Sequence, residues 1–318
     1  MRARVLAVAR RWNVLAMVVA LMAALGLAMP SAAIADPASY SVIFSGGGSA
    51  GSNHDRYYEE TLRMWNIMKD ALGVPVGNIY VLFADGTDPA IDRSSNVNSD
   101  WSMITAAGGN IEAGTSANLQ NILTTLGDTV GGEDCFYFWS FDHGYNGTYD
   151  DNPPTPATLD TGGINGWGSW VPDEQFQAWT TGLNDAKAAM YAFAQCFAGD
   201  MKQTPGTEGV DVGAGNIFTA WAADWYEPSW GRSWADAWAD GLEAGLTTTH
   251  ELGQYALAND IDGPNGSGAE HPGWAGANFD ILTNEIVPEP ASVLFFLGCV
   301  AAGAFRLRKR SQHLRERE

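Results

Sequence analysis

The chain has 318 residues, with 37 acidic and 17 basic side chains and a formal net charge of −20. Residues 36–287 hold 34 acidic and only seven basic residues, so this part alone carries −27. Such a surface repels phosphate backbones, which argues against a nucleic-acid-binding protein. In a chain that is 46% hydrophobic, about 250 residues can bury one sizeable core, which predicts one folded domain over residues 36–286.

The first 35 residues have the features of a secretory signal peptide. Four arginines and an uncharged stretch at 14–29 precede Ala33-Ile34-Ala35, which forms an A-x-A site before Asp36. This order is typical of export and implies a signal peptidase as a partner. The alternative, a retained membrane anchor, needs roughly 18 or more apolar residues. The apolar stretch here is shorter and ends at Pro30.

Residues 40–44 predict a short β-strand that ends in a loop of Ser45 and three glycines. From residue 55 to residue 72 apolar side chains recur every three or four positions, and Gly73 and Pro75 end this predicted helix. Residues 79–83 predict a second buried strand. A strand, a helix and a strand in this order form a βαβ unit, which implies a parallel sheet with a right-handed crossover.

The same alternation continues along the chain. Strands are predicted at residues 135–141, 189–194 and 217–222, and helices at 117–126, 172–186, 233–246 and 248–258. Apolar strands that alternate with amphipathic helices predict an α/β sandwich with helices on both faces of the sheet. We interpret 146–165 as an acidic loop, with a cover for a cleft or a cation site as alternatives. Residues 259–278 are rich in Gly, Pro and Asn and are also predicted to be loop.

The C-terminal segment 287–310 contains Pro-Glu-Pro at 288–290, an apolar stretch at 291–305 and four basic residues within 306–310. Basic residues directly after an apolar span stay in the cytoplasm. This order resembles the PEP-CTERM sorting signal of proteins exported by Gram-negative bacteria, which implies an exosortase-type processing enzyme. An ordinary C-terminal anchor is the alternative. We expect a periplasmic or cell-surface protein, tethered to the membrane by this helix until it is processed and released, with residues 311–318 as a cytoplasmic tail.

Two cysteines lie in the predicted domain, and Cys299 lies in the C-terminal apolar stretch. In an exported protein the first interpretation of Cys135 and Cys196 is a disulfide. Cys135 begins one predicted strand, however, and Cys196 follows the end of the next. Seven residues at about 3.3 Å each separate the two positions by roughly 20 Å, whereas a disulfide needs Cα atoms within roughly 7 Å. We therefore predict a free Cys196 and a buried, apolar Cys135.

His143 and Cys196 follow the carboxyl ends of two predicted parallel strands, where ligands bind in open sheets. An imidazole there can favour the thiolate and later protonate a leaving amine. Gly144 has no side chain to block the site, so its amide and that of Cys196 are candidate donors to an oxyanion. From the pattern alone, ordinary packing roles for a single His and a single Cys stay open.

Two motifs at these positions resemble the legumains, whose arrangement of His and Cys is shared by caspases and the catalytic subunit of the GPI transamidase. Phe-Asp-His-Gly at 141–144 is similar to a legumain strand that ends in Asp-His-Gly, and Ala-Gln-Cys-Phe-Ala-Gly at 194–199 to Glu-Ala-Cys-Glu-Ser-Gly. Weaker similarities at 53–57, 73–79 and 225–231 extend the resemblance over residues 40–242. It implies a caspase-like three-layer α/β/α sandwich with a mostly parallel sheet, and a cysteine peptidase without a metal or other cofactor.

The resemblance implies that a protein or peptide substrate is cleaved through a Cys196 thioester, with His143 as acid and base. In legumains an Arg of the first loop and residues after the last strand hold an Asn or Asp side chain of the substrate. This implies substrate-binding roles for Arg56, Glu227 and Ser229, and a guanidinium suits a carboxylate or an amide. A solvated Arg56 at a helix start is the alternative.

The sequence departs from legumains beside the predicted nucleophile. Phe197 and Ala198 replace polar residues, and Pro228 replaces a serine of the pocket wall, so the substrate preference is open. A transpeptidase of the same fold would capture the acyl-enzyme with an amine. A catalytically silent domain would bind a partner or a polysaccharide through its Trp residues. A glycosidase would use paired carboxylates, although no acidic pair stands out.

Overall fold

The protein is described by a computed structural model that covers residues 37–146, 162–202, 210, 215–224, 226–230, 232–264, 266 and 270–287. The chain divides into two units, Met1–Pro37 and Ala38–Glu318, and the folded domain belongs to the second. The predicted signal peptide, the sorting segment beyond Val287 and the tail at 311–318 lie outside the described residues. The domain boundaries drawn from them therefore stay predictions.

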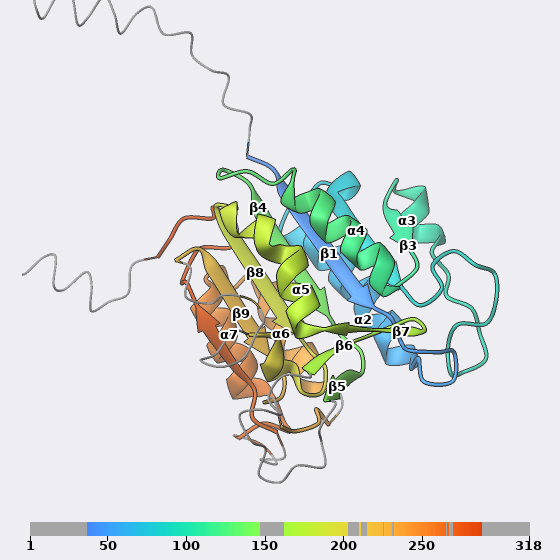
Figure 1. The fold of residues 1–318 in the computed structure, drawn as a ribbon. Helices are drawn as coiled ribbons and strands as arrows, with labels where there is room; N and C mark the ends of the chain where they lie inside the picture. Colours follow the sequence, from blue (N-terminus) through green and yellow to red (C-terminus); the bar gives the residue numbers. More distant parts are fainter. Residues whose placement is uncertain are drawn as a thin grey trace, which may run out of the picture. The chain divides into compact units, whose positions relative to one another are not determined.

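A seven-stranded sheet forms the centre of the second unit (Figure 1). The strands are β1 (Ser39–Ser45), β2 (Ile79–Phe83), β3 (Asn110–Glu112), β4 (Cys135–Ser140), β8 (Ala188–Phe193), β9 (Ile217–Trp221) and β10 (Gly273–Gly276). Their order is β10-β9-β8-β4-β1-β2-β3, and each neighbouring pair is parallel except β10 with β9. Every residue of β4 and β8 is buried, as expected for parallel strands covered on both faces.

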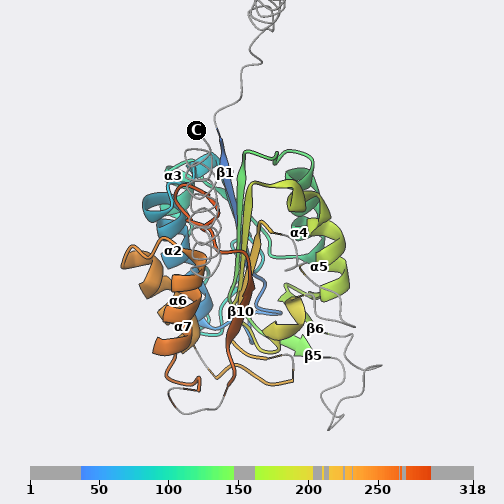
Figure 2. The ribbon, with the colours of Figure 1, turned by 90° about the vertical axis from the view of Figure 1, so that its left-hand side faces the viewer.

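Helices cover both faces of this sheet (Figure 2). One layer holds α2 (Asp55–Asn66), α3 (Ser102–Ala106), α6 (Ser233–Glu243) and α7 (Thr249–Asn259), and the other holds α4 (Ser116–Gly127) and α5 (Asp173–Thr180). Successive residues of β4 point to opposite layers: Trp139 stacks on Trp234 of α6, and Phe138 meets Phe176 of α5. These layers confirm the predicted caspase-like three-layer α/β/α sandwich.

The predicted strands and helices of the two layers are confirmed within a few residues, but both predicted loops were partly wrong. β10 lies within 259–278 and pairs antiparallel with β9. Its sequence, Gly-Trp-Ala-Gly, has no strand pattern; a Cβ on Gly253 of α7 would lie 2.6 Å from Trp274, so close helix packing helps to hold it. The predicted loop 146–165 ends in β6 (Gly162–Gly166), which pairs with β5 (Gly144–Asn146) and β7 (Ser169–Pro172). Residues 147–161 lie outside the described residues.

The predicted membrane tether requires a correction. Within the part of the chain that the structure describes, no helix is both long enough and apolar enough to cross a membrane. The apolar stretch at 291–305 lies outside that part. The predicted localisation through a C-terminal membrane helix was wrong by this finding, and we do not retain it.

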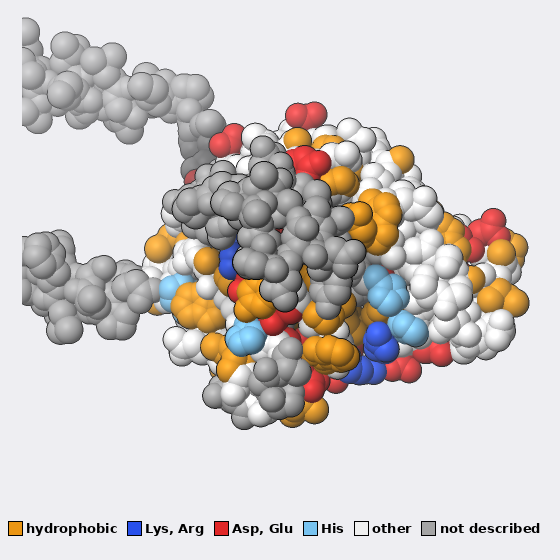
Figure 3. Space-filling view, turned by 60° about the horizontal axis from the view of Figure 1, so that its bottom comes forward, with side chains coloured by type: hydrophobic (Ala, Val, Ile, Leu, Met, Phe, Trp, Pro, Cys, Tyr) orange, Lys and Arg blue, Asp and Glu red, His pale blue; other side chains and the backbone are white. Residues whose placement is uncertain are grey.

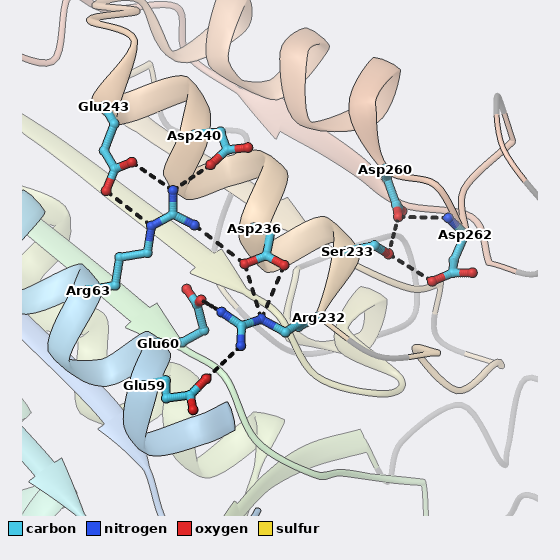
Figure 4. A network of polar contacts seen from close by, with 10 residues as sticks. All are labelled: Glu59, Glu60, Arg63, Arg232, Ser233, Asp236, Asp240, Glu243, Asp260 and Asp262. Atoms are coloured by element: carbon cyan, nitrogen blue, oxygen red, sulfur yellow. Dashed lines mark hydrogen bonds and ion pairs between the residues drawn. The ribbon is translucent and has the colours of Figure 1, made fainter. Parts of the chain in front are cut away.

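An ion-pair network joins α2 to the start and outer face of α6 (Figure 4). Arg63 contacts Asp236, Asp240 and Glu243, and Arg232 contacts Glu59, Glu60 and Asp236, at nitrogen–oxygen distances of 2.5 to 3.4 Å. Glu60 is fully buried, and this burial raises the pKa of its carboxyl group although the charge of Arg232 opposes the shift. The network therefore aligns the helix that borders the glycine loop with the helix that follows β9.

We expect the folded protein to be more stable at pH 5 than at pH 8. Burial raises the pKa of Glu60, Asp85, Asp142 and Asp173, to about 6 at Asp85 and about 7 at Asp142. The folded chain therefore binds these protons more tightly than the unfolded chain, whose carboxyls titrate near 4. Stability is lost as the pH rises through the folded pKa values, by roughly 3 kcal/mol at Asp142 alone. Thermal unfolding at pH 5, 6.5 and 8 at constant ionic strength measures this, and a higher Tm at pH 8 contradicts it.

Candidate active site

The register of β4 and β8 brings His143 and Cys196 to one edge of the sheet. Ser140 and Phe193 pair at the ends of these neighbouring parallel strands, and His143 and Cys196 each follow three residues later. On this face of the molecule His side chains lie beside basic side chains, with acidic ones around them (Figure 3). Both residues line a pocket of about 230 Å³. Its other lining residues are Arg56, Tyr57, Phe141, Asp142, Ala194 and Ser229.

The imidazole of His143 is oriented by the loop after β1 and by α2. Its Nε2 lies 3.0 Å from the backbone oxygen of Ser52. Because a carbonyl oxygen only accepts hydrogen bonds, Nε2 carries a proton, and Nδ1 is then the basic nitrogen of the neutral ring. The hydroxyl of Tyr57 lies 3.4 Å from Nδ1 and 3.5 Å from Nε2. The Ser52 carbonyl therefore selects the tautomer of His143 in which Nε2 carries the proton.

Asp142 is a buried carboxyl group that joins the glycine loop to the end of β4. Its Oδ2 accepts a hydrogen bond from the backbone N–H of Gly47, and its Oδ1 accepts one from the N–H of His143 at 2.6 Å. Burial raises the pKa of Asp142 to about 7, although these backbone hydrogen bonds lower it. Gly47 has a φ of +69°, and a Cβ there would lie 2.5 Å from Asn53, so the loop requires glycine. Asp142 thus positions His143 through the backbone.

The thiol of Cys196 lies among backbone amides. The N–H of Ser229 donates to its Sγ at 3.3 Å. Burial raises the pKa of the thiol, whereas the amides of Ser229, Gly144 and Cys196 itself act to lower that pKa. Phe197 follows with a φ of +57°, a left-handed conformation that costs a non-glycine residue roughly 1–2 kcal/mol. Its N–H is held by the backbone oxygen of Glu227 at 3.0 Å, so the turn after the thiol is fixed by the segment that also supplies Ser229.

Gly144 packs directly on the backbone of Cys196. A Cβ at this position would lie 1.7 Å from the carbonyl oxygen of Cys196, a distance that no side chain can occupy. The glycine therefore sets how closely the chain after β4 approaches the chain after β8. It also brings its amide to the thiol, as an oxyanion donor requires.

The other predicted site residues separate into two groups. Arg56 lies in the pocket, its guanidinium 5.0 Å from the ring centroid of Tyr57, with Nε buried and without a hydrogen-bond partner among the described residues. Ser229 also lines the pocket. Glu227 does not: its carboxylate accepts hydrogen bonds from the N–H of Asp224 at 3.1 Å and from the backbone and Nδ1 of His271. The structure therefore brings Arg56 and Ser229, but not Glu227, to the pocket shared by His143 and Cys196.

Sequence reasoning missed three groups of this site. The Ser52 carbonyl and the Ser229 amide are backbone groups, so their residue type gives no signal. Tyr57 follows Arg56 at the start of α2 and belongs to the weak motif at 53–57. Its position in a first helical turn, beside a predicted pocket Arg, was the one available signal for its place next to His143.

Two solved structures resemble this chain at low sequence identity. No family model matches the chain, and no curated protein matches its sequence. A solved structure of a Geobacter sulfurreducens protein covers 80% of this chain and 96% of its own, with a TM-score of 0.46 and 11% identity. Caspase-1 from Spodoptera frugiperda covers 78% of this chain and 88% of its own, with a TM-score of 0.42 and 10% identity. The class, a caspase-like α/β sandwich, rests on the strand order and the two helical layers.

Replacement of Gly144 by Ala tests the close approach of the two strand ends. The added methyl group overlaps the Cys196 carbonyl, so the chain after β4 must move and carry His143 with it. We expect Gly144→Ala to slow the labelling of Cys196 by a peptide electrophile at least tenfold while far-UV circular dichroism stays unchanged. Gly77→Ala is the matched control, because a Cβ there meets nothing within 4 Å. Equal labelling of both variants contradicts this role of Gly144.

The raised pKa of Cys196 predicts the pH dependence of its alkylation. Iodoacetamide reacts with thiolate, and an unperturbed thiol titrates near 8.5. Because burial disfavours the thiolate, the alkylation rate of Cys196 should keep rising above that pH. Cys135, 1% exposed and with its pKa raised by burial to about 12, should stay unmodified in the folded protein. Peptide mass spectrometry across pH 6 to 10 measures both, and a plateau for Cys196 below pH 8 contradicts the expectation.

Proposed function

We propose that the protein is a cysteine peptidase of the legumain-like type, with Cys196 as nucleophile and His143 as acid and base. The observation that carries the proposal is the convergence of an oriented imidazole, a thiol and backbone N–H groups on one pocket at the carboxyl edge of the sheet. Nucleophile, base and oxyanion donors in mutual reach are the requirements for acyl transfer.

The proposed reaction begins from a neutral thiol, because burial disfavours the thiolate in the free enzyme. Nδ1 of His143 takes the thiol proton as Sγ of Cys196 attacks the substrate carbonyl carbon. The oxyanion then accepts hydrogen bonds from the amides of Gly144 and Cys196. The tetrahedral intermediate collapses with cleavage of the C–N bond, and the imidazolium returns the proton to the leaving amine. Water, activated by His143, attacks the thioester and releases the acid and the thiol.

Arg56 supports a preference for substrates with Asp, or secondarily Asn, before the cleaved bond. It is a cationic group in the pocket that makes no ion pair with a carboxylate among the described residues. A guanidinium favours a planar carboxylate, which it can bind at two points. Ser229 lies on the wall of the same pocket.

A peptide electrophile tests the proposal on the purified full-length protein. We expect a probe with Asp beside the reactive group to label Cys196, and Cys196→Ala to lose all labelling. His143→Ala should slow labelling at least a hundredfold, since general acid–base groups contribute about 10² to 10⁴. Cys135→Ser is the control and should label at the wild-type rate. Mass spectrometry of the labelled peptide gives the position.

Labelling of Cys135, or an equal loss of labelling in the Cys135 and Cys196 variants, would contradict the assignment of Cys196 as the nucleophile. Probes with Asn and Leu in place of Asp measure the preference, and Arg56→Gln should reduce Asp labelling more than Leu labelling. If an added amine appears in the product of a cleaved peptide, the acyl-enzyme transfers to amines, and the enzyme is a transpeptidase of the same site. A well-folded protein that no probe labels would instead be a silent binding domain.

A further inference from the structure

Three carboxyl groups lie together beyond the end of α7, outside the pocket of Cys196. They belong to Asp260, Asp262 and Glu270, and one oxygen of each lies within 4.8 Å of the others. Asp260 is 1% exposed and Glu270 is 0% exposed, while Asp262 is half-buried. Figure 4 shows Asp260 and Asp262 on either side of the Ser233 hydroxyl at the start of α6. Three acidic groups therefore face one another largely away from water.

Two buried oxygens of this cluster, one on Asp260 and one on Glu270, have no hydrogen-bond partner among the described residues. These two oxygens are Oδ2 of Asp260 and Oε1 of Glu270. Neither side chain forms an ion pair with a basic residue of the described part of the chain. Ser233 Oγ lies 2.5 Å from Asp260 Oδ1 and 2.9 Å from Asp262 Oδ2, but a hydroxyl has one proton and serves only one of them at a time. A buried carboxylate that stays charged is paired or coordinates a metal, so these two oxygens are suited to bind a cation.

We propose that Asp260, Asp262 and Glu270 bind a calcium ion. The donor set is all oxygen, which excludes the soft ligands that zinc and copper prefer and suits a hard divalent cation. Carboxylates within 4.8 Å of one another match a Ca²⁺ ion, whose ligand distances are about 2.3–2.6 Å. Calcium accepts the irregular, flexible ligand geometry of a loop better than magnesium, which demands a near-ideal octahedron. Backbone oxygens and water complete the coordination.

The same residues connect the ion to the thiol. Oε2 of Glu270 accepts the N–H of Trp230 at 2.9 Å, next to the Ser229 amide that donates to Cys196. His271, which follows Glu270, is hydrogen-bonded to Glu227 on the other side of Ser229. An ion that fixes Glu270 therefore holds the segment 227–230 at both ends. This consequence for turnover rests on the proposed function, whereas the binding of the ion does not.

Metal binding is measured on the full-length protein after treatment with EDTA and dialysis. Titration with Ca²⁺ by calorimetry at pH 7.5 should show one site, with a Kd between about 100 μM and 1 mM, the range of extracellular calcium modules. Tb³⁺, excited through Trp residues, should bind the same site and be displaced by Ca²⁺. Addition of Ca²⁺ should slow hydrogen exchange in residues 226–230 at least fivefold.

Variants of the three carboxyl residues distinguish Ca²⁺ binding at this site from nonspecific binding to the acidic surface. Asp262→Asn and Glu270→Gln should each weaken Ca²⁺ binding at least tenfold, while Asp185→Asn, an exposed carboxylate on the other layer, leaves it unchanged. Near-UV circular dichroism checks folding, and Asp262, being half-buried, gives a readable result if Glu270→Gln does not fold. Absence of Ca²⁺ binding at 5 mM, about fivefold above that range, or binding retained by both variants, overturns the proposal. Displacement of Tb³⁺ by Mg²⁺ as effective as that by Ca²⁺ overturns the assignment to calcium. None of these measurements needs peptidase activity.

Discussion

The candidate site depends on the parallel pairing of β4 with β8. Ser140 and Phe193 end the two strands at the same level of the sheet, so two segments about fifty residues apart in the sequence leave it side by side. A shift of the register by one residue would turn every side chain of β8 to the other layer. The buried aromatic residues on both faces of β4 and β8 resist such a shift, because Phe138 and Trp139 each fit a different helical layer. The packing of the core therefore also holds His143 and Cys196 at the same edge of the sheet.

Around these two side chains, most of the polar groups that position the site come from the backbone. The carbonyl of Ser52 selects the tautomer of His143, and the amides of Ser229 and Gly144 face the thiol. The positions of backbone groups change little when nearby side chains are replaced. Contacts through backbone groups, however, require two segments of the chain to approach each other very closely. Glycine at 47 and at 144 permits that approach. The hydrogen bonds by which the Asp142 carboxyl joins the glycine loop to the end of β4 offset the free-energy cost of burying it.

The parts of the fold that could be predicted from the sequence are those with a clear pattern of apolar side chains. Apolar runs such as the predicted strands 135–141 and 189–194 are typical of a covered parallel sheet. The layers and the edge that holds His143 and Cys196 could therefore be predicted from the pattern. β10 was missed because it depends on partners distant in the sequence, β9 and the helix that packs on Trp274. Glu227 was expected at the pocket from its place after β9, but its carboxylate binds His271, a contact between loops that no local pattern encodes.

The distribution of the few cations adds an argument about Arg56. Five of the seven basic residues of the domain form ion pairs with described carboxylates, and Lys202 lies over the ring of Trp221. Arg56 lies over Tyr57 in the pocket instead. In a domain with so large an acidic excess, Coulomb attraction would readily supply an internal partner to an arginine that only needed neutralisation. Among the described residues Arg56 has no carboxylate partner, and it lines the pocket of the thiol. This supports the proposal that it binds an anionic group of the substrate, whose repulsion by the acidic surface its charge would offset.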